Sequence, residues 1–114
     1  MTEEMNKYIA EIVGVDTGHS TLNEAIFNYL VYGIPPGGFT TSLLENNLYE
    51  AICRADHWNK ENIVYVVKEV GMNMPLLAWG SPERVRLWLK DEDNRRTEYS
   101  EQVLEQATMM KLES

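Results

Sequence analysis

Apolar residues recur every three or four positions along most of the chain, which is the period of an amphipathic α-helix. This spacing predicts a helix over residues 2–13, although Ile12–Val15 could also form a strand. A second helix is predicted over residues 22–32, because its apolar face follows a Thr21–Glu24 capping box and stops before Gly33.

A stretch rich in proline and glycine, residues 33–39, follows and cannot continue as a helix or a strand. After it, hydroxyl side chains at Thr40–Ser42 can cap a third helix, for which the sequence predicts a buried apolar stripe. Asn46 and Asn47 are unusual inside that helix, since asparagine side chains compete for backbone hydrogen bonds. We interpret them as solvent-facing residues, or as residues that reach a neighbouring loop and hold it. The predicted stripe is Leu44, Leu48, Ala51, Ile52 and Ala55.

Residues 56–59 interrupt this pattern, and a β-branched segment over residues 60–70 then fits both a helix and a strand. An acid near its start, a lysine near its end and Gly71 as a stop signal favour a helix. Residues 71–80 form a second predicted loop. Ser81–Glu83 then combine a hydroxyl cap, a proline and an acid, which together predict the start of another helix.

The last segment has a narrow apolar stripe and is otherwise polar. The preceding helix should end in the charged stretch 91–94, and the last helix should begin at Thr97 or Tyr99. We therefore predict a helical body over residues 1–92 and an acidic helix over residues 93–114, which is an arm for homo-oligomerisation. The predicted fold is all-α, a single compact bundle of about five helices with a C-terminal helical arm. The stripe of the last helix is Tyr99, Val103, Ala107 and Met110.

The composition narrows the class of protein. A chain of 114 residues predicts one domain, and the single cysteine excludes an internal disulfide. No apolar run approaches the length of a membrane span, so we expect a soluble protein of the cytoplasm, and the negative net charge argues against binding to an anionic membrane surface. A net charge of −8 argues against direct binding to nucleic-acid phosphate. It provides solubility alone, or it marks an acidic surface for a basic partner.

The catalytic motifs in the chain are weak. Asp16-Thr17-Gly18 is the tripeptide of aspartic proteases, but the helical periodicity around it differs from their β-rich fold. Cys53 and His57 are four residues apart and could form a nucleophile pair or half of a metal site, yet no second cysteine exists. Gly37-Gly38 lacks the spacing of a phosphate loop. We therefore predict a protein that is not an enzyme and has no metal or cofactor.

The two loops are the best candidate for a binding site, because each carries glycine and an aromatic residue and leads into a helix. Such loops can hold a flat ring and an anionic group. The alternative is that Phe39 and Trp79 close the ends of the core, while Arg54 pairs with Glu50 or Asp56. The predicted ligand-binding residues are Gly37, Gly38, Phe39, Asn46, Asn47, Arg54, Trp79, Ser81 and Arg84.

Four motifs occur in a familiar order: Pro36–Phe39, Leu44–Leu48, Arg54–Asp56 and Trp79–Glu83. Over residues 22–90 the chain thereby resembles a family of small proteins encoded by tailed phages and prophages, which lack an agreed function. Asn47 stands where the family pattern has an aspartate, which puts in doubt any function of that carboxylate here. The resemblance implies an accessory protein that acts on the host.

The leading prediction is a non-catalytic binding protein that sequesters a small nucleotide-like defence signal between the two loops. In this hypothesis Phe39 or Trp79 stacks on the base. The amides of Gly37 and Gly38, with Arg54 and one of Arg84 or Arg86, hold the phosphate. The alternative is an acidic protein-interaction module that inhibits a host protein or a nucleic-acid-binding factor.

Overall fold

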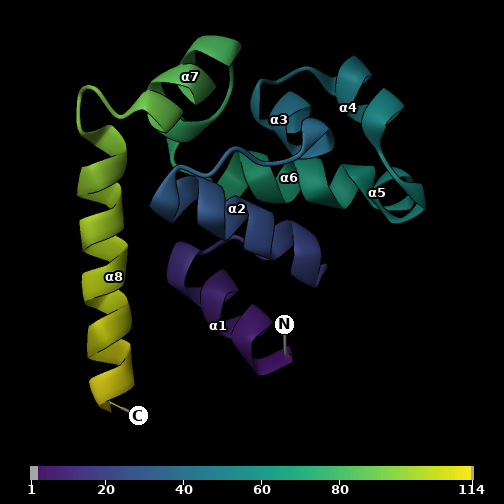
Figure 1. Ribbon diagram of the computed structural model, residues 1–114. Helices are drawn as coiled ribbons and strands as arrows, with labels where there is room; N and C mark the ends of the chain where they lie inside the picture. The colour runs from purple at the N-terminus through teal and green to yellow at the C-terminus, as the bar shows by residue number, and fades with distance from the viewer. Residues whose placement is uncertain (1–2, 114) are drawn as a thin grey trace.

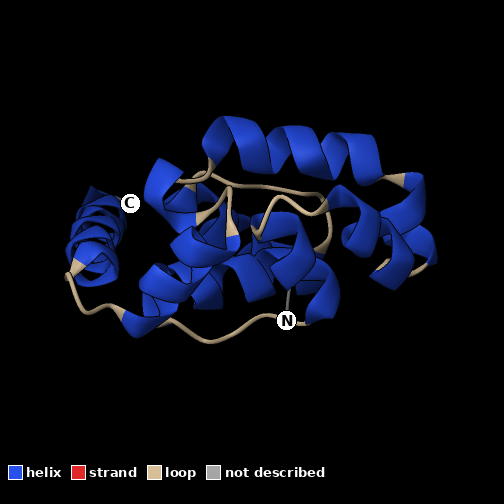
Figure 2. Cartoon of the chain, turned by 90° about the horizontal axis from the view of Figure 1, so that it is seen from above, coloured by secondary structure: helices blue, strands red, loops and turns tan. Residues whose placement is uncertain are grey.

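The computed structural model describes the backbone of residues 3–113 and the side chains of residues 4–109. Over this part of the chain the fold consists of eight α-helices and one short 3₁₀ turn without any strand, so the all-α prediction is confirmed (Figure 2). More helices occur than the predicted five because the third predicted helix divides in two and residues 57–61 form a helix of their own. The elements are α1 (Glu3–Val13), α2 (Ser20–Tyr32), α3 (Gly38–Leu44), α4 (Leu48–Arg54), α5 (His57–Glu61), α6 (Ile63–Asn73), η1 (Leu76–Ala78), α7 (Pro82–Lys90) and α8 (Arg95–Glu113).

Helix α2 is central, with α1 on one side and α3 on the other, and α8 crosses its end (Figure 1). Ile26, Tyr29 and Leu30 of this helix are completely buried. The Tyr29 hydroxyl donates to the carbonyl of Ala78 at 2.7 Å, so the buried phenol has an acceptor. Burial raises the pKa of Tyr29 well above its ordinary value. This helix therefore ties the second loop to the core.

The ends of α2 show one correct and one wrong prediction. The helix begins at Ser20, and its cap is His19, whose Nδ1 accepts the amide hydrogen of Leu22 at 3.4 Å. The capping box predicted at Thr21–Glu24, two residues after this cap, is therefore wrong. Gly33 ends the helix with φ = 66°, as the glycine signal predicts. The strand alternative for Ile12–Val15 is also excluded, because α1 continues to Val13.

A turn at residues 45–47 separates α3 from α4, where one continuous helix was predicted. Asn46 has φ = 63°, a left-handed conformation that asparagine tolerates better than most residues. The amide of Asn47 donates to the carbonyl of Ser42, and that of Asn46 donates to Leu43, which is the bonding of a Schellman motif. The Asn47 side chain then accepts the amide hydrogen of Glu50 and caps α4.

Among the later helices, too, some boundaries were predicted correctly and others were not. Helix α7 begins as predicted, and the Ser81 hydroxyl accepts the amide hydrogen of Arg84 at 3.1 Å. Helix α5 was missed, although Asp56 caps it by accepting the amide hydrogen of Asn59. Helix α6 passes through Gly71, so the predicted stop at that glycine is wrong.

Helix α8 packs against the rest of the molecule along its apolar stripe. Val103 and Ala107 are buried in the common core, and the helix contacts α1 and α2. The side chain of Met110, which also belongs to the predicted stripe, lies outside the described side chains. Within the described residues, no helix is both long and apolar enough to cross a membrane. The stripe is therefore used inside one chain, and homo-oligomerisation stays a prediction.

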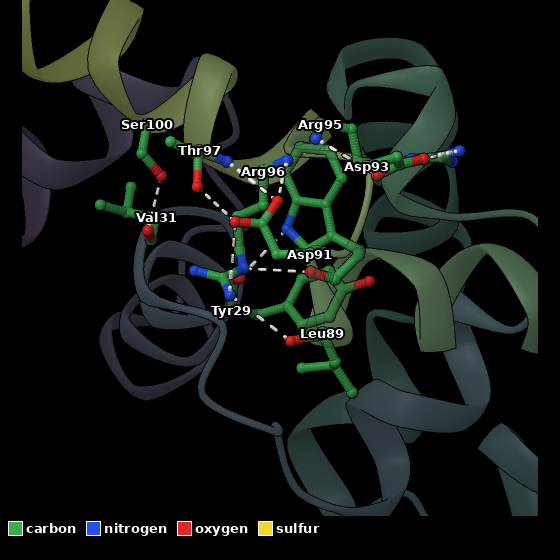
Figure 3. Close-up of polar contacts among 10 residues, drawn as sticks. Tyr29, Val31, Leu89, Asp91, Asp93, Arg95, Arg96, Thr97 and Ser100 are labelled. Atoms are coloured by element: carbon green, nitrogen blue, oxygen red, sulfur yellow. Dashed lines mark hydrogen bonds and ion pairs between the residues drawn. The ribbon is translucent and has the colours of Figure 1, made fainter.

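A network of hydrogen bonds fixes the start of α8 against the end of α7 (Figure 3). The Asp91 carboxylate accepts the amide hydrogens of Arg96 at 2.9 Å and Thr97 at 3.2 Å, and it also accepts the Thr97 hydroxyl hydrogen. The hydrogen bond from the Thr97 side chain is the main reason that the pKa of Asp91 lies below its ordinary value. Asp91 therefore caps α8 from outside the helix.

Arg96 completes the junction by bonding the carbonyl end of α7. Its Nε donates to the carbonyl of Trp88 at 3.0 Å, and its Nη2 donates to that of Leu89 at 3.4 Å. The guanidinium also covers Gly33, where a Cβ would lie 2.4 Å from Cζ of Arg96. A cation at this position suits the ends of both α2 and α7, because carbonyl oxygens are concentrated there.

Two further hydrogen bonds bind the end of α2 to its neighbours. The Ser100 hydroxyl of α8 donates to the carbonyl of Val31 at 2.6 Å (Figure 3). The indole nitrogen of Trp88 donates to the carbonyl of Tyr29 at 3.2 Å. Side chains from α8 and α7 therefore bond carbonyl groups in the last turn of α2, and the Tyr29 carbonyl also accepts the amide hydrogen of Gly33.

Candidate functional site

The first loop carries Gly37 and Gly38 into the start of α3. Gly37 is the cap of that helix, and no Cβ at this position would meet another atom within 4 Å. At Gly38, by contrast, a Cβ would lie 2.9 Å from Nη1 of Arg54. The group that approaches Gly38 closely is therefore a side chain of this same protein.

An open hollow of about 370 Å³ lies beside Gly38. Arg54 lines it and forms an ion pair with Glu50, with 3.4 Å between Nε and Oε2. This pair is one of the two that the sequence suggested as the alternative to ligand binding by Arg54. Glu45 and Glu50 bring two carboxylates to the hollow against the single guanidinium of Arg54. This balance of charge disfavours a phosphate group. The lining residues are Pro36, Gly38, Thr41, Ser42, Glu45, Asn47, Glu50 and Arg54.

The second loop is held by its own hydrogen bonds. Nη1 of Arg84 donates to the carbonyls of Leu76 and Trp79, at 3.2 and 3.3 Å. The amide of Gly80 donates to the carbonyl of Leu44 at 2.7 Å, which fastens the loop to the end of α3. Arg84 therefore acts as a brace of this loop in the structure, and Ser81 acts as the cap of α7.

The two loops meet opposite ends of α3. The first leads into Gly38, and the second bonds Leu44, so roughly 10 Å of helix lies between them at a rise of about 1.5 Å per residue. The cavity that Trp79 lines contains no residue of the first loop, and the hollows beside the first loop contain neither Trp79 nor Ser81. The structure thus divides the predicted site residues among separate places.

Phe39 is part of the core, with 9 % of its surface exposed. A base cannot stack on it in this structure, which corrects that part of the nucleotide hypothesis. The core position is the alternative that the sequence also allowed. Trp79 is only partly buried and remains at the surface beside α6.

The other motifs have local structural roles. The Asp16 carboxylate accepts hydrogens from the Gly18 amide and from the side chain of Asn23, both at 2.9 Å, and so organises the loop after α1. Cys53 is exposed, and His57 pairs with Glu61 rather than with the thiol. In the part of the chain that the structure describes, three metal-ligating side chains do not come together anywhere.

The outer face of α4 is a feature that the sequence pattern did not predict. Leu48 and Ile52 were expected in a buried stripe, but they are 51 % and 44 % exposed. Tyr49, next to Leu48, is 75 % exposed. The other three members of that stripe, Leu44, Ala51 and Ala55, are buried as predicted. The left-handed turn at Asn46 ends α3 before α4 begins, so the stripe does not lie on one continuous helix. Two consecutive asparagines at that point were the available signal.

A small apolar cavity of about 80 Å³ adjoins this face. Leu48 belongs to both features, since it lines the cavity and is also exposed on α4. Buried Val70 of α6 forms part of the wall. The Trp79 indole nitrogen is buried and has no hydrogen-bond partner among the described residues. The cavity is lined by Leu43, Asn46, Leu48, Val67, Val70 and Trp79.

No protein-family model matches the chain, and no curated protein or solved structure shows significant similarity to it. The resemblance to the phage-encoded family therefore stays a prediction from the four motifs, and the function has to be argued from the geometry of the site.

Proposed function

We propose that this protein is a non-catalytic interaction module that docks a basic, amphipathic segment of another protein on the outer face of α4. The observation that carries the proposal is the exposure of Leu48, Tyr49 and Ile52 on a helix of seven residues. Contiguous exposed apolar surface of this kind is typical of interaction sites. Tyrosine is also among the residues that contribute most to protein interfaces.

The charge around this face indicates the chemistry of the partner. Helices α3 to α5 and their turns carry four carboxylates, Glu45, Glu50, Asp56 and Glu61, against Arg54 and Lys60. Arg54 is itself paired with Glu50, which leaves the acids in excess. The whole chain has a net charge of −8. Lysine and arginine on the partner would therefore be attracted and correctly oriented.

The resemblance to phage proteins adds a context to this proposal. An acidic protein of a phage can occupy the basic surface with which a host factor binds nucleic acid or another protein. The occupied surface on the host factor would present an apolar side chain between basic ones, because α4 exposes apolar groups and helices α3 to α5 carry more acids than bases.

Capture of a nucleotide-like signal has less support from the geometry. Sites for drug-sized ligands enclose roughly 300–1,000 Å³, and the hollow beside Gly38 reaches that size but brings two carboxylates to the ligand. The apolar cavity beside Trp79 has only about 80 Å³. A thermal-shift screen with cyclic dinucleotides and ADP-ribose tests this function, and no shift is expected.

A displayed library of short random peptides, selected against the full chain, tests the docking proposal. The expected peptides combine lysine or arginine with aliphatic residues and lose at least about tenfold in affinity for Tyr49→Glu, which corresponds to roughly 1.4 kcal/mol. Tyr8→Glu is the matched control, because Tyr8 is also exposed but lies on α1, on the other side of α2 (Figure 1). Selection of no peptide, or equal binding to Tyr49→Glu, would contradict the proposal.

A further inference from the structure

The cavity next to the α4 face suggests how a docked segment is anchored. Leu48 is shared by the cavity and the face, so a segment lying on α4 passes the cavity mouth. The floor is apolar and well ordered by the core, because Leu43 and Val70 are 5 % and 1 % exposed. An apolar pocket at an interface is the usual position of an anchoring side chain.

The cavity remains open because the turn at Asn46 directs α4 along α3 rather than over α6. Helices α3 and α4 pack closely together, while Val67 of α6 stays only half-buried. The Trp79 ring covers the surface of α6 at Gly71, where a Cβ would lie 3.6 Å from the ring. The cavity is thus lined by several elements, and its exposed lining residues are Asn46 and Leu48.

The size of the cavity selects a small aliphatic group. A dry apolar cavity of roughly 150 Å³ is known to accept a benzene ring, so about 80 Å³ suits a smaller, branched aliphatic group. Trp79 lines the cavity, and its indole nitrogen is buried without a hydrogen-bond partner among the described residues. A buried donor without an acceptor is unfavourable, and an incoming acceptor would relieve it.

We propose that the cavity receives one leucine-like side chain of the docked basic segment and that Trp79 Nε1 donates a hydrogen bond to an acceptor carried by that segment. This inference rests on the proposed docking function and specifies its partner. The segment has a single leucine-like anchor, flanked by lysine or arginine that face the acids of α3 to α5.

N-acetyl-leucinamide is a direct probe, since it contains the aliphatic group and carbonyl acceptors. In ¹⁵N-labelled full-length protein the indole resonance of Trp79 should shift with increasing concentration of this probe, and N-acetyl-glycinamide should leave it unchanged. The indole resonance of Trp88 is the internal control, because that nitrogen already donates to the carbonyl of Tyr29. Equal shifts at Trp79 and Trp88, or no shift at Trp79, would overturn the inference.

Val67→Phe separates this inference from the proposed function, because the larger side chain fills the cavity from its half-buried wall and leaves Tyr49 in place. Peptides selected on the wild-type protein should bind this variant at least about tenfold more weakly. Peptides that need Tyr49 but bind Val67→Phe as tightly as wild type would refute the anchor alone. Failure to select any peptide would refute the docking function itself.

Discussion

At the junction of α7 and α8, side chains bond the polar groups that helix ends leave free, whereas the outer face of α4 leaves three large apolar side chains uncovered. All the contacts of the junction lie within one chain, so their contribution to the stability of the fold is enough to explain them. Stability does not explain the exposed face of α4, because burying Leu48 and Ile52 would have favoured folding. This contrast between a junction that maintains the fold and an uncovered α4 face is the basis of the docking proposal.

The largest effect is expected from Trp88→Ala. Trp88 is 1 % exposed and donates to the carbonyl of Tyr29, so the variant loses buried surface and leaves a cavity at the junction. We expect the free energy of unfolding to fall by about 3–5 kcal/mol, measured by urea denaturation. Trp88→Phe should lose less, because it retains most of the ring contacts. A loss as small as that of an exposed residue would show that the junction is not part of the core.

Arg96→Ala should have the next largest effect. It removes two charge-assisted hydrogen bonds to the end of α7, and we expect a loss of about 1–3 kcal/mol in the free energy of unfolding. Arg95→Ala is the matched control, since the Arg95 side chain pairs with Asp93 rather than with the carbonyls of α7 and should contribute less. Equal losses for the two arginines would contradict the special role of Arg96.

Asn46→Ala tests the turn that exposes α4. A residue with a Cβ is strained at φ = 63°, and alanine lacks the tolerance of asparagine for this conformation. We expect the free energy of unfolding to fall by about 1 kcal/mol, measured by thermal denaturation. Asn46→Gly should be at least as stable as Asn46→Ala, because glycine adopts this conformation without strain. The reverse order would mean that the left-handed turn is not required.

Ile52→Ala should have the smallest effect on stability. The side chain is 44 % exposed on the outer face of α4, so the free energy of unfolding should change by no more than about 0.5 kcal/mol. Ile26→Ala is the matched core variant, because Ile26 is completely buried and should lose about 2–5 kcal/mol. Similar losses at the two positions would place Ile52 in the core and remove the argument for a docking face.

The sequence was informative where structure depends on neighbouring residues. Gly33 and Ser81 were recognised as the end of α2 and the cap of α7, because a cap acts within one turn of its helix. The same reasoning missed His19 as a cap, since its imidazole acceptor is less common than the hydroxyl of Thr21. It also placed a stop at Gly71, where α6 continues because Val66 and Val70 are held in the core.

The candidate site was less predictable, because its residues acquire their roles from distant partners. Glycine and aromatic residues in two loops predicted one pocket, but Phe39 turned into the core and Arg84 bonded its own loop. Gly38 is approached by the side chain of Arg54, which lies sixteen positions later, beyond the turn at Asn46. The ion pair of Arg54 with Glu50 was foreseeable, since those residues are four apart on one helix.

The sequence by itself determined that the chain is helical and acidic and where several of its helices begin and end. These properties depend on side-chain periodicity, composition and hydrogen bonds between near neighbours. Only the tertiary structure decided which apolar residues are exposed. A single left-handed residue, Asn46, ends α3 and turns the chain into α4, and the packing of α4 on its neighbours leaves Leu48 and Ile52 exposed.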